Sequence, residues 1–572
     1  MTLARSLALV SLGALACASR GHAQGYSFRL VAQTGDPAPG SLGGHFTWLG
    51  WPTINASGQV AFAAGSDGAI ADTGMWRTAF NDPQSCELII GQDYPVPGSP
   101  PEIRFGQFDP SFHHPLLNDA GNVGFSAPLT NMPDPANGLF RMVNGSIQRV
   151  AVQGDVAPGT AGTATYASVS NLPSFNASNS LAFGATLAGP GVNASNDRAY
   201  FAHWFGGVQM FVREGNAVPD MPGTVFSFGP SSFPTLEASG AIGFTAATTG
   251  ATAMPWSLWR GWPGAIDSVA LDGQPTPVGG TFAVDGGLFN FWDLSPGVGT
   301  LAFHADAVLP VGSLSGIWGM SGGVLNDYAV VDHPGPLGAY KALQSSSAQV
   351  AEDGTAAFWA SFQGGSENTD SAIIRSPLGG PATIMVREGD AAEGFGPGVV
   401  FDDMGGWYTP LPLINDAHQI VLDAFVRGPR IGLENNRGLW LVDVDGTLHN
   451  LLREGQLLSI GGQAPRQVIS WVVSFGICEH GGRRPGVNDR GDVAIQIAFA
   501  DETAAVVVAQ RPGPCESDLN NDGFVDAADL AILLGAWGNV GPIGEGADVD
   551  WDGDTDGADL AVLLGAWGVC EG

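Results

Sequence analysis

The stretch Pro52-Thr53-Ile54-Asn55-Ala56-Ser57-Gly58-Gln59-Val60-Ala61-Phe62 contains the pattern on which most of the chain is built. Asn with Gly at the fourth position is typical of a tight turn whose last residue needs a positive φ. The alternating residues Val60, Ala61 and Phe62 then predict a strand. Each copy of this pattern therefore predicts a turn that leads into a strand.

Seven further copies follow at intervals of 55 to 73 residues. They are Asn118 to Phe125, Asn176 to Phe183, Glu237 to Phe244, Pro296 to Phe303, Ala351 to Phe358, Asn415 to Leu422 and Asn488 to Ile495. In the copy at Asn176, Asn179 replaces Gly, and Asn is the residue that best tolerates positive φ. Repetition at this period indicates a propeller, a solenoid or an array of domains.

A second motif alternates with the first and also occurs eight times. Its copies are Gly35-Asp36, Gln92-Asp93, Gly154-Asp155, Gly215-Asn216, Gly273-Gln274, the divergent Asp332-His333, Gly389-Asp390 and Gly455-Gln456. The chain opens on this motif and closes on the first one, with Ala504 to Ala509 as its last strand. Such an offset is what ring closure requires, because an N-terminal strand would then complete the C-terminal blade.

The predicted fold is therefore mostly β, a single β-propeller of about eight blades. A ring removes exposed strand edges, which an open solenoid would have to cap. Seven blades with an insertion remain an alternative, because roughly 60 residues per repeat is generous for four strands.

The composition limits the class of protein. The 572 residues carry a formal net charge of −33, which argues against nucleic acid or an anionic membrane as a partner. Hydrophobic residues make up 44% of the chain, which excludes a disordered polymer.

The N-terminus has the features of a secretory signal peptide, assigned to residues 1–23. A basic start to Arg5 precedes the apolar run Leu7 to Ala16, and Gly21-His22-Ala23 offers a cleavage site. Lipid attachment at Cys17 is the alternative. The protein is thus expected to be secreted or associated with a bacterial cell surface, where a Cys86–Cys478 disulfide is one candidate pairing. The repeat body is assigned to residues 24–510 and a linker to 511–514.

The last segment, 515–572, contains an acidic stretch that occurs twice. Asp518 to Asp529 and Asp548 to Asp559 have oxygen-bearing side chains at loop positions 1, 3, 5, 9 and 12, with Gly at position 6. Each leads into an apolar segment that ends Leu-Leu-Gly-Ala-Trp-Gly and predicts a short helix. No Lys or Arg lies between Cys515 and Gly572 to balance the carboxylates, so a hard divalent cation is expected. Packing of the Leu and Trp faces of the two helices would form a small core.

This segment resembles a type I dockerin, a duplicated calcium module that binds cohesin domains. The resemblance implies two Ca²⁺ ions and a cohesin-like partner. It implies as ligands Asp518, Asn520, Asp522, Asp526 and Asp529, then Asp548, Asp550, Asp552, Asp556 and Asp559, with main-chain oxygens from Phe524 and Asp554. Positions 10 and 11 are Ala527-Ala528 and Gly557-Ala558, where many dockerins have hydroxyl groups. Cys515 and Cys570 bracket the module as a candidate disulfide.

The body resembles the Asn-x-x-Gly-x-x-Ala-Phe tandem-repeat proteins, secreted bacterial proteins with interchangeable C-terminal anchors. That resemblance implies no catalytic residue. Acidic residues repeated once per copy, such as Glu214, Glu388 and Glu454, are interpreted as structural. The non-repeated candidates for chemistry are His113-His114, Asp402-Asp403, Glu479-His480 and Arg483-Arg484. Several Trp residues, among them Trp51, Trp259, Trp262 and Trp407, are either sugar-stacking or core residues.

Two functions follow as hypotheses. The first is an exported, non-enzymatic repeat protein with a binding or scaffolding role, held in place by the calcium module, with extracellular polysaccharide as one candidate ligand. The second is a polysaccharide hydrolase or lyase that carries a dockerin. A central pocket of non-repeated carboxylates would favour the enzyme.

Overall fold

The repeated turn joins two antiparallel strands, as predicted. In the first copy, the N–H of Gly58 donates to the carbonyl of Asn55 (3.0 Å), and Gly58 has a φ of +80°. This turn connects β3 (Thr53–Ile54) to β4 (Val60–Ser66). Asn179, which replaces the glycine in the third copy, has a φ of +61°. The prediction of positive φ at the fourth position is confirmed.

The computed structural model describes most of the chain. The described residues are 26–79, 82–109, 113–132, 136–204, 206–228, 234–283, 292–294, 299–310, 312–343, 348–366, 368–402, 404, 412–474, 486–511, 517–520, 524–539, 547, 549 and 555–569. The expected signal peptide (1–23) lies outside them.

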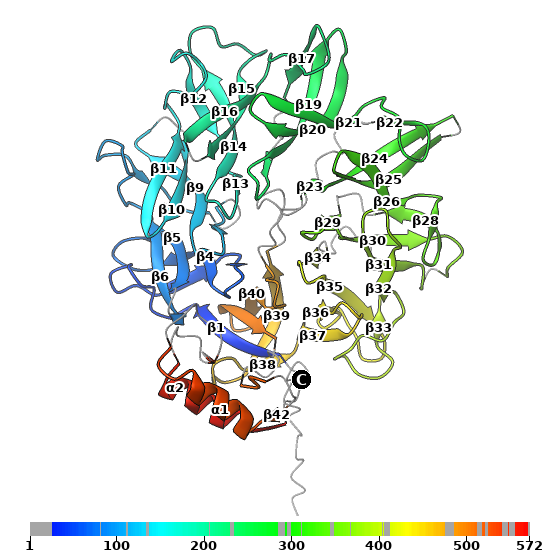
Figure 1. Ribbon diagram of the computed structural model, residues 1–572. Helices are drawn as coiled ribbons and strands as arrows, with labels where there is room; N and C mark the ends of the chain where they lie inside the picture. Colours follow the sequence, from blue (N-terminus) through cyan, green and yellow to red (C-terminus); the bar gives the residue numbers. More distant parts are fainter. Residues whose placement is uncertain are drawn as a thin grey trace, which may run out of the picture.

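Eight antiparallel sheets form the blades of a propeller, numbered here in chain order (Figure 1). Blade 1 comprises β2 (Phe46–Leu49), β3, β4, β5 (Thr73–Ala79) and β6 (Asp82–Gly91). Blade 2 comprises β7 (Arg104–Phe105), β8 (Leu116–Leu117), β9 (Val123–Thr130), β10 (Asn137–Val143) and β11 (Ser146–Val152). Blade 3 comprises β12 (Thr165–Val169), β13 (Ser174–Phe175), β14 (Leu181–Ala188), β15 (Arg198–Trp204) and β16 (Gly207–Arg213).

The next three blades repeat this order of strands. Blade 4 comprises β17 (Thr224–Ser227), β18 (Thr235–Leu236), β19 (Ile242–Gly250), β20 (Met254–Trp262) and β21 (Ala265–Leu271). Blade 5 comprises β22 (Thr281–Ala283), β23 (Trp292–Leu294), β24 (Leu301–Leu309), β25 (Gly312–Ser321) and β26 (Val324–Val330). Blade 6 comprises β27 (Pro334–Gly335), β28 (Gly338–Leu343), β29 (Gln349–Val350), β30 (Ala356–Phe362), β31 (Ser371–Ser376) and β32 (Thr383–Arg387).

The last two blades complete the ring. Blade 7 comprises β33 (Val400–Phe401), β34 (Leu413–Ile414), β35 (Ile420–Arg427), β36 (Arg437–Val442) and β37 (Leu448–Arg453). Blade 8 comprises β38 (Leu457–Leu458), β39 (Arg466–Val473), β40 (Val493–Phe499), β41 (Ala504–Gln510) and the N-terminal strand β1 (Ser27–Gln33).

β1 closes the ring by pairing antiparallel with β41, from Ser27 opposite Gln510 to Gln33 opposite Ala505. The first and last strands of the repeat body therefore share one blade, as the offset between the two motifs predicted. This pairing confirms the propeller and rules out the open solenoid. The number of blades is eight, so the seven-bladed alternative was wrong.

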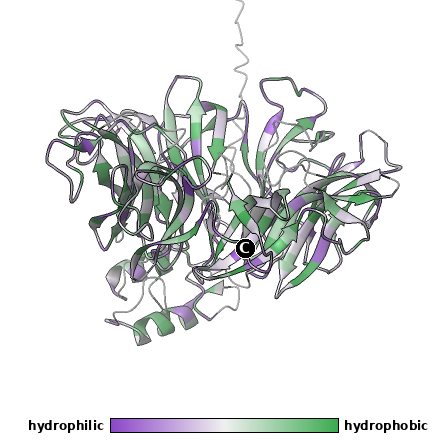
Figure 2. Ribbon diagram, turned by 90° about the horizontal axis from the view of Figure 1, so that it is seen from above, coloured by the Kyte–Doolittle hydropathy of each residue, from purple (hydrophilic) through white to green (hydrophobic). Residues whose placement is uncertain are grey.

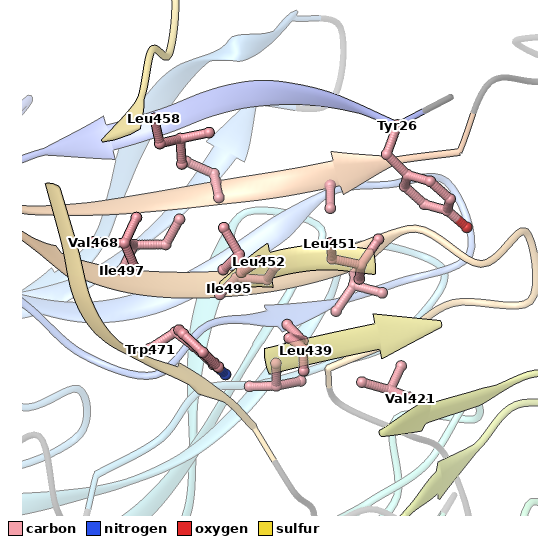
Figure 3. Close-up of a cluster of buried hydrophobic side chains, with 14 of the residues drawn as sticks. Tyr26, Val421, Leu439, Leu451, Leu452, Leu458, Val468, Trp471, Ile495 and Ile497 are labelled. Atoms are coloured by element: carbon pink, nitrogen blue, oxygen red, sulfur yellow. The ribbon is translucent and has the colours of Figure 1, made fainter. Parts of the chain in front are cut away.

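The hydrophobic core lies between neighbouring blades. Figure 3 shows the cluster between blades 7 and 8, where Leu439 and Val421 pack with Trp471, Ile495 and Ile497. Tyr26, directly before β1, is buried in the same cluster, so the closing strand is anchored in the core. In Figure 2 hydrophobic residues run along the strands of the blades and along the C-terminal helices.

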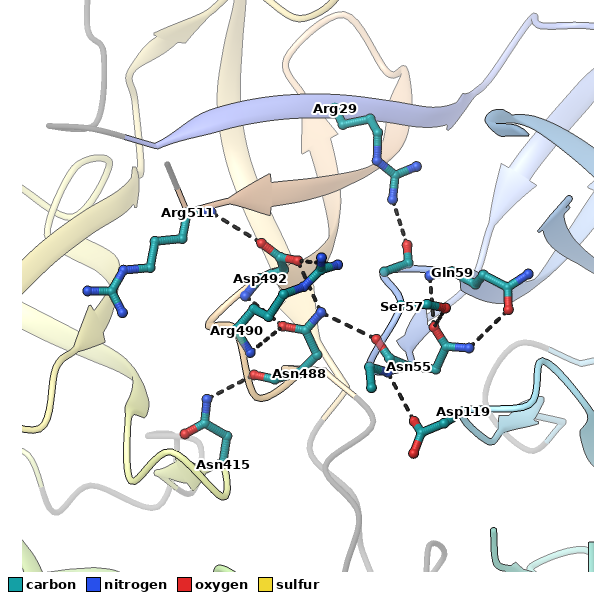
Figure 4. Close-up of polar contacts among 12 residues, drawn as sticks. Arg29, Asn55, Ser57, Gln59, Asp119, Asn415, Asn488, Arg490, Asp492 and Arg511 are labelled. Atoms are coloured by element: carbon teal, nitrogen blue, oxygen red, sulfur yellow. Dashed lines mark hydrogen bonds and ion pairs between the residues drawn. The ribbon is translucent and has the colours of Figure 1, made fainter. Parts of the chain in front are cut away.

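A belt of asparagine side chains links the turns of successive blades. The Nδ2 of Asn55 donates to the carbonyl of Asn118 (3.1 Å), and Asn118 donates in the same way to Asn176 (3.3 Å). Asn415 donates to Asn488 (2.8 Å), and Asn488 donates to Asn55 (3.3 Å) across the closure (Figure 4). The Oδ1 of each accepts the N–H four residues on, so one amide both forms its own turn and binds the next blade.

A second set of contacts caps the same turns from the preceding blade. Different side chains donate to the carbonyl of the fourth turn residue: Arg29 to Gly58, Arg77 to Gly121, Arg141 to Asn179, Trp204 to Gly240 and Tyr328 to Gly354. The donor is an Arg, a Trp or a Tyr side chain, but in every case it satisfies the same main-chain carbonyl of the turn.

The second motif holds the turn after the outermost strand. The side chains of Asp155, Asn216, Gln274, Asp390 and Gln456 each accept the N–H of the residue three positions earlier, at 2.8 to 3.1 Å. The side chain at this position therefore makes the same structural contact in five of the eight copies.

The C-terminal segment contains two short helices, α1 (Ala527–Gly535) and α2 (Gly557–Gly565). They pack on each other through the fully buried Leu533 and Leu563. The strands β42 (Phe524–Val525) and β43 (Gly568–Val569) pair beside them.

Candidate functional site

The two helices of the C-terminal segment begin in the same way. The Asp526 carboxylate accepts the N–H of Ala528 (2.7 Å), and Asp529 accepts the N–H of Asp526 (2.8 Å), which forms a capping box. Asp556 and Asp559 repeat this arrangement in α2, with both distances at 2.7 Å. The sequence duplication is therefore also a duplication of local geometry.

Asp529 and Asp559 are fully buried carboxylates. Asp529 also accepts the N–H of Asn520 (3.2 Å), and Asp559 accepts that of Val549 (2.7 Å), so each draws the start of its loop onto its helix. Burial opposes ionisation of Asp529, but the N–H donors of Asp526 and Asn520 outweigh it and keep the pKa of this carboxyl below its ordinary value. The charge therefore persists inside the segment.

These carboxylates fit a hard cation by their chemistry. Residues 515–572 contain thirteen Asp or Glu and no Lys or Arg, so no side chain of the segment can balance the buried charge. Ca²⁺ prefers oxygen ligands of this type. Asp518, Asn520, Asp526, Asp529, Asp556, Asp559 and the main chain of Phe524 are the predicted ligands that belong to the described residues.

The other predicted ligands, Asp522, Asp548, Asp550, Asp552 and Asp554, lie outside the described residues. So do Cys17, Cys478, Cys515 and Cys570, so neither candidate disulfide is tested. Cys86 lies half-buried in β6, with its Sγ 3.4 Å from the carbonyl of Val31. Within the part of the chain that the structure describes, no group of three or more His, Cys, Asp or Glu side chains is placed to hold a metal ion.

The two helices expose a matched apolar surface. Leu534 is 53% exposed and its equivalent Leu564 is 52% exposed. Trp537 and Trp567, which follow the helices, are 47% and 48% exposed. The expectation that these tryptophans pack in the small core was wrong, because each helix ends two residues before its Trp and the contact is made by Leu533 and Leu563.

The propeller axis is the second place where functional residues were expected. In each of blades 1 to 7 the innermost strand is split in two, and the second halves lie side by side around the axis from β3 to β34. Among the described residues between the halves are His113-His114 in blade 2 and Asp402 in blade 7.

The structure separates the two histidines. His113 is buried between the ring of Phe108 (6.0 Å) and the main chain of Asp109, whose N–H donates to its Nδ1 (3.0 Å). Burial lowers the pKa of His113. His114 instead stacks on Trp51 of blade 1, with the rings 5.0 Å apart and 12° from parallel. Sequence reasoning missed this pair, although both residues stand four positions before the repeated Asn.

The carboxylates of the repeats form structural contacts. Glu388 is buried and lies 3.3 Å from Arg427, which also pairs with Asp402 (2.9 Å). Glu214 is buried, accepts from Ser227 and has a pKa raised by burial. Asp403, Glu479-His480, Arg483-Arg484 and Trp407 lie outside the described residues. Trp259 is a core residue, whereas Trp51 and Trp262 are 40% and 42% exposed.

The fold defines an eight-bladed β-propeller closed by its N-terminal strand and followed by a short helical pair. The chain belongs to a family of unknown function, DUF7453, whose model matches residues 24–230 and 298–513. No curated protein matches the chain. None of the helices among the described residues is long and apolar enough to cross a membrane.

Among solved structures, the chain is similar to an oligogalacturonate lyase in complex with manganese, at 10% identity and a TM-score of 0.35, over 73% of this chain and 96% of that one. It is similar to prolyl oligopeptidase B from Galerina marginata, at 9% identity and a TM-score of 0.35, over 79% of this chain and 55% of that one. A third is the polysaccharide lyase Uly1, at 8% identity and a TM-score of 0.32, over 68% and 88% of the two chains.

Proposed function

We propose that this chain is an exported, non-enzymatic binding or scaffolding protein whose C-terminal module docks it, in a calcium-dependent manner, at the cell surface or in an extracellular complex. The propeller would supply the binding surface. The dockerin-like module would bind two Ca²⁺ ions and contact a cohesin-like or other surface protein.

The observation that carries the proposal is the internal symmetry of the module. Two buried carboxylates, Asp529 and Asp559, complete the capping boxes of two helices that expose equivalent apolar side chains at Leu534 and Leu564. Cation binding would hold both loops and would thereby fix the spacing of the two exposed faces. Ala527 and Ala528, at the start of α1, are exposed and have no hydroxyl group. The partner would therefore contact an apolar rather than a hydroxyl-bearing surface.

Calcium titration of the full mature chain tests the metal. After removal of bound metal with EDTA, calorimetry should give two Ca²⁺ per chain. Hydrogen exchange at 524–539 and 555–569 should slow on calcium addition. The Asp522→Ala/Asp552→Ala variant, changed at position 5 of each loop, should lose both effects. Asp267→Ala removes an exposed charge on β21 and serves as the control. Calcium binding that survives in the double variant would contradict the ligand assignment.

Retention in the producing bacterium tests the docking. The wild-type chain should be found with the cell envelope and be released by an EDTA wash. Leu534→Glu/Leu564→Glu should appear in the medium, because it places charge on the exposed apolar face. Val324→Glu, at a residue of β26 that is 59% exposed, is the matched control. Equal retention of both variants would refute docking through this face.

A further inference from the structure

The stacked pair of Trp51 and His114 joins blades 1 and 2 beside the inner ring of short strands. Trp51 stands two residues before β3, and His114 stands two residues before β8. β3 and β8 are neighbours in the inner ring of short strands. Leu172 occupies the equivalent position before β13, in the next blade. Three successive blades thus carry Trp, His and Leu at the same position before their short inner strand.

Trp51 is far more exposed than the five tryptophans that are buried in the blades. Trp76, Trp259, Trp318, Trp440 and Trp471 are each no more than 2% exposed, whereas Trp51 is 40% exposed. An indole that is exposed at the centre of a ring contributes little to the core, since burial is what makes a large aromatic side chain stabilising.

The indole is held by its neighbour across the blade boundary. His114 stacks on it, with a centroid distance of 5.0 Å. Thr53 Oγ1 donates to the carbonyl of Pro115 (3.2 Å), which joins the two segments that carry the rings. His113, next to His114, is buried and accepts the N–H of Asp109 (3.0 Å). The ring is therefore held in place before any ligand arrives, which lowers the entropy lost on binding.

We infer that Trp51, supported by His114, is the stacking platform of a binding site for a neutral polysaccharide on the propeller axis. The C–H face of a pyranose ring is flat and apolar, and an exposed, pre-positioned indole offers a matching surface. This inference rests on the binding role proposed above and names its ligand class.

The net charge selects among polysaccharides. A chain with a formal charge of −33 repels polyanions, so uronate polymers are disfavoured relative to neutral glycans.

Binding of neutral hexasaccharides to the full mature chain tests the site. The probes are the β-1,4-glucan, β-1,3-glucan, β-1,4-mannan and β-1,4-xylan hexamers, with hexagalacturonate as the anionic comparison. At least one neutral hexamer should bind in calorimetry and change the tryptophan fluorescence. Trp51→Ala should weaken it by about tenfold or more, because an exposed aromatic contact is lost.

Trp51→Phe keeps an aromatic ring and should weaken binding less than Trp51→Ala. If the alanine variant unfolds, Trp51→Phe should still bind more weakly than the wild type. Trp262→Ala removes a tryptophan of similar exposure, at the end of β20, and should bind as the wild type does. Absence of binding to all four neutral hexamers, stronger binding of the uronate, or unchanged affinity in Trp51→Phe and Trp51→Ala would each overturn the inference.

The calcium-site variant separates this inference from the docking proposal. Asp522→Ala/Asp552→Ala should bind the hexamer with unchanged affinity, because the platform belongs to the propeller. Loss of calcium binding with retained glycan binding would leave the platform standing. A wild-type chain that binds calcium but none of the neutral hexamers would remove the platform and keep the docking module.

Discussion

Asn488→Ala is expected to weaken the closure of the ring. The Nδ2 of Asn488 donates to the Asn55 carbonyl across the seam (3.3 Å) and to Asp492 (3.0 Å), and its Oδ1 accepts the N–H of Asp492 (2.9 Å). These residues are 3 to 5% exposed, so water cannot readily replace the amide. Alanine would leave the buried N–H of Asp492 unsatisfied, at about 1–3 kcal/mol, and would remove one of the two donors of the Asn55 carbonyl, which keeps the N–H of Gly58, at about 0.5–1.5 kcal/mol. The predicted loss is about 2–4 kcal/mol.

Urea unfolding followed by tryptophan fluorescence measures this loss as a lower midpoint with an unchanged slope. Asn176→Ala is the matched comparison, because Asn176 bonds in the same way to Glu237 (2.8 Å) between blades that are consecutive in the chain. Both variants should lose similar stability, but only Asn488→Ala should accelerate hydrogen exchange in β1 and β41. A loss below about 0.5 kcal/mol, or equal exchange in β1 in both variants, would refute the view that this amide seals the ring.

Three further predictions concern other contacts of the ring. Deletion of residues 26–34 should leave β41 with an unpaired edge and cause aggregation. A peptide with the sequence of Ser27–Gln33 should reduce this aggregation in light-scattering measurements. A monomeric deletion variant of wild-type stability would contradict the prediction. Asn179→Gly should lower the free energy of unfolding measured in urea by about 1–3 kcal/mol, even though Gly suits positive φ. The reason is that Asn179 Oδ1 accepts hydrogen bonds from both Asn118 (2.8 Å) and Asn122 (2.9 Å). A neutral or stabilising effect would show that these bonds contribute nothing. Burial raises the pKa of Glu214 above 4.5, so the ionised carboxylate destabilises the fold at higher pH. Glu214→Gln should therefore raise the melting temperature at about pH 7 but not at about pH 4. A gain of equal size at both pH values would exclude ionisation as the cause.

The turns and their conformation could be predicted from local sequence. Asn followed by Gly at the fourth position specifies a tight turn whichever blade contains it, because the requirement for positive φ is a property of four consecutive residues. The side chain by which the preceding blade caps each turn could not be predicted in this way. Arg29, Trp204 and Tyr328 serve one function in different blades with different chemistry, so no motif identifies them.

The candidate sites also differ in whether local sequence or contacts between blades define them. The spacing of Asp518 to Asp529 predicts a metal loop because its ligands are neighbours in sequence. The exposure of Trp537 and Trp567 was mispredicted, since it depends on where each helix ends relative to its partner. Trp51 and His114 are 63 residues apart and meet only because β3 and β8 are adjacent in the inner ring.

The sequence by itself determined the repeat, the alternation of the two motifs and, through their offset, a ring closed by its first strand. These features follow from local backbone preference and from the order of elements, which do not depend on how blades pack. Only the tertiary structure decided the number of blades, the asparagine belt across the seam and the aromatic pair on the axis. Those depend on contacts between residues from 57 to 433 positions apart, which the chain makes only once the ring is closed.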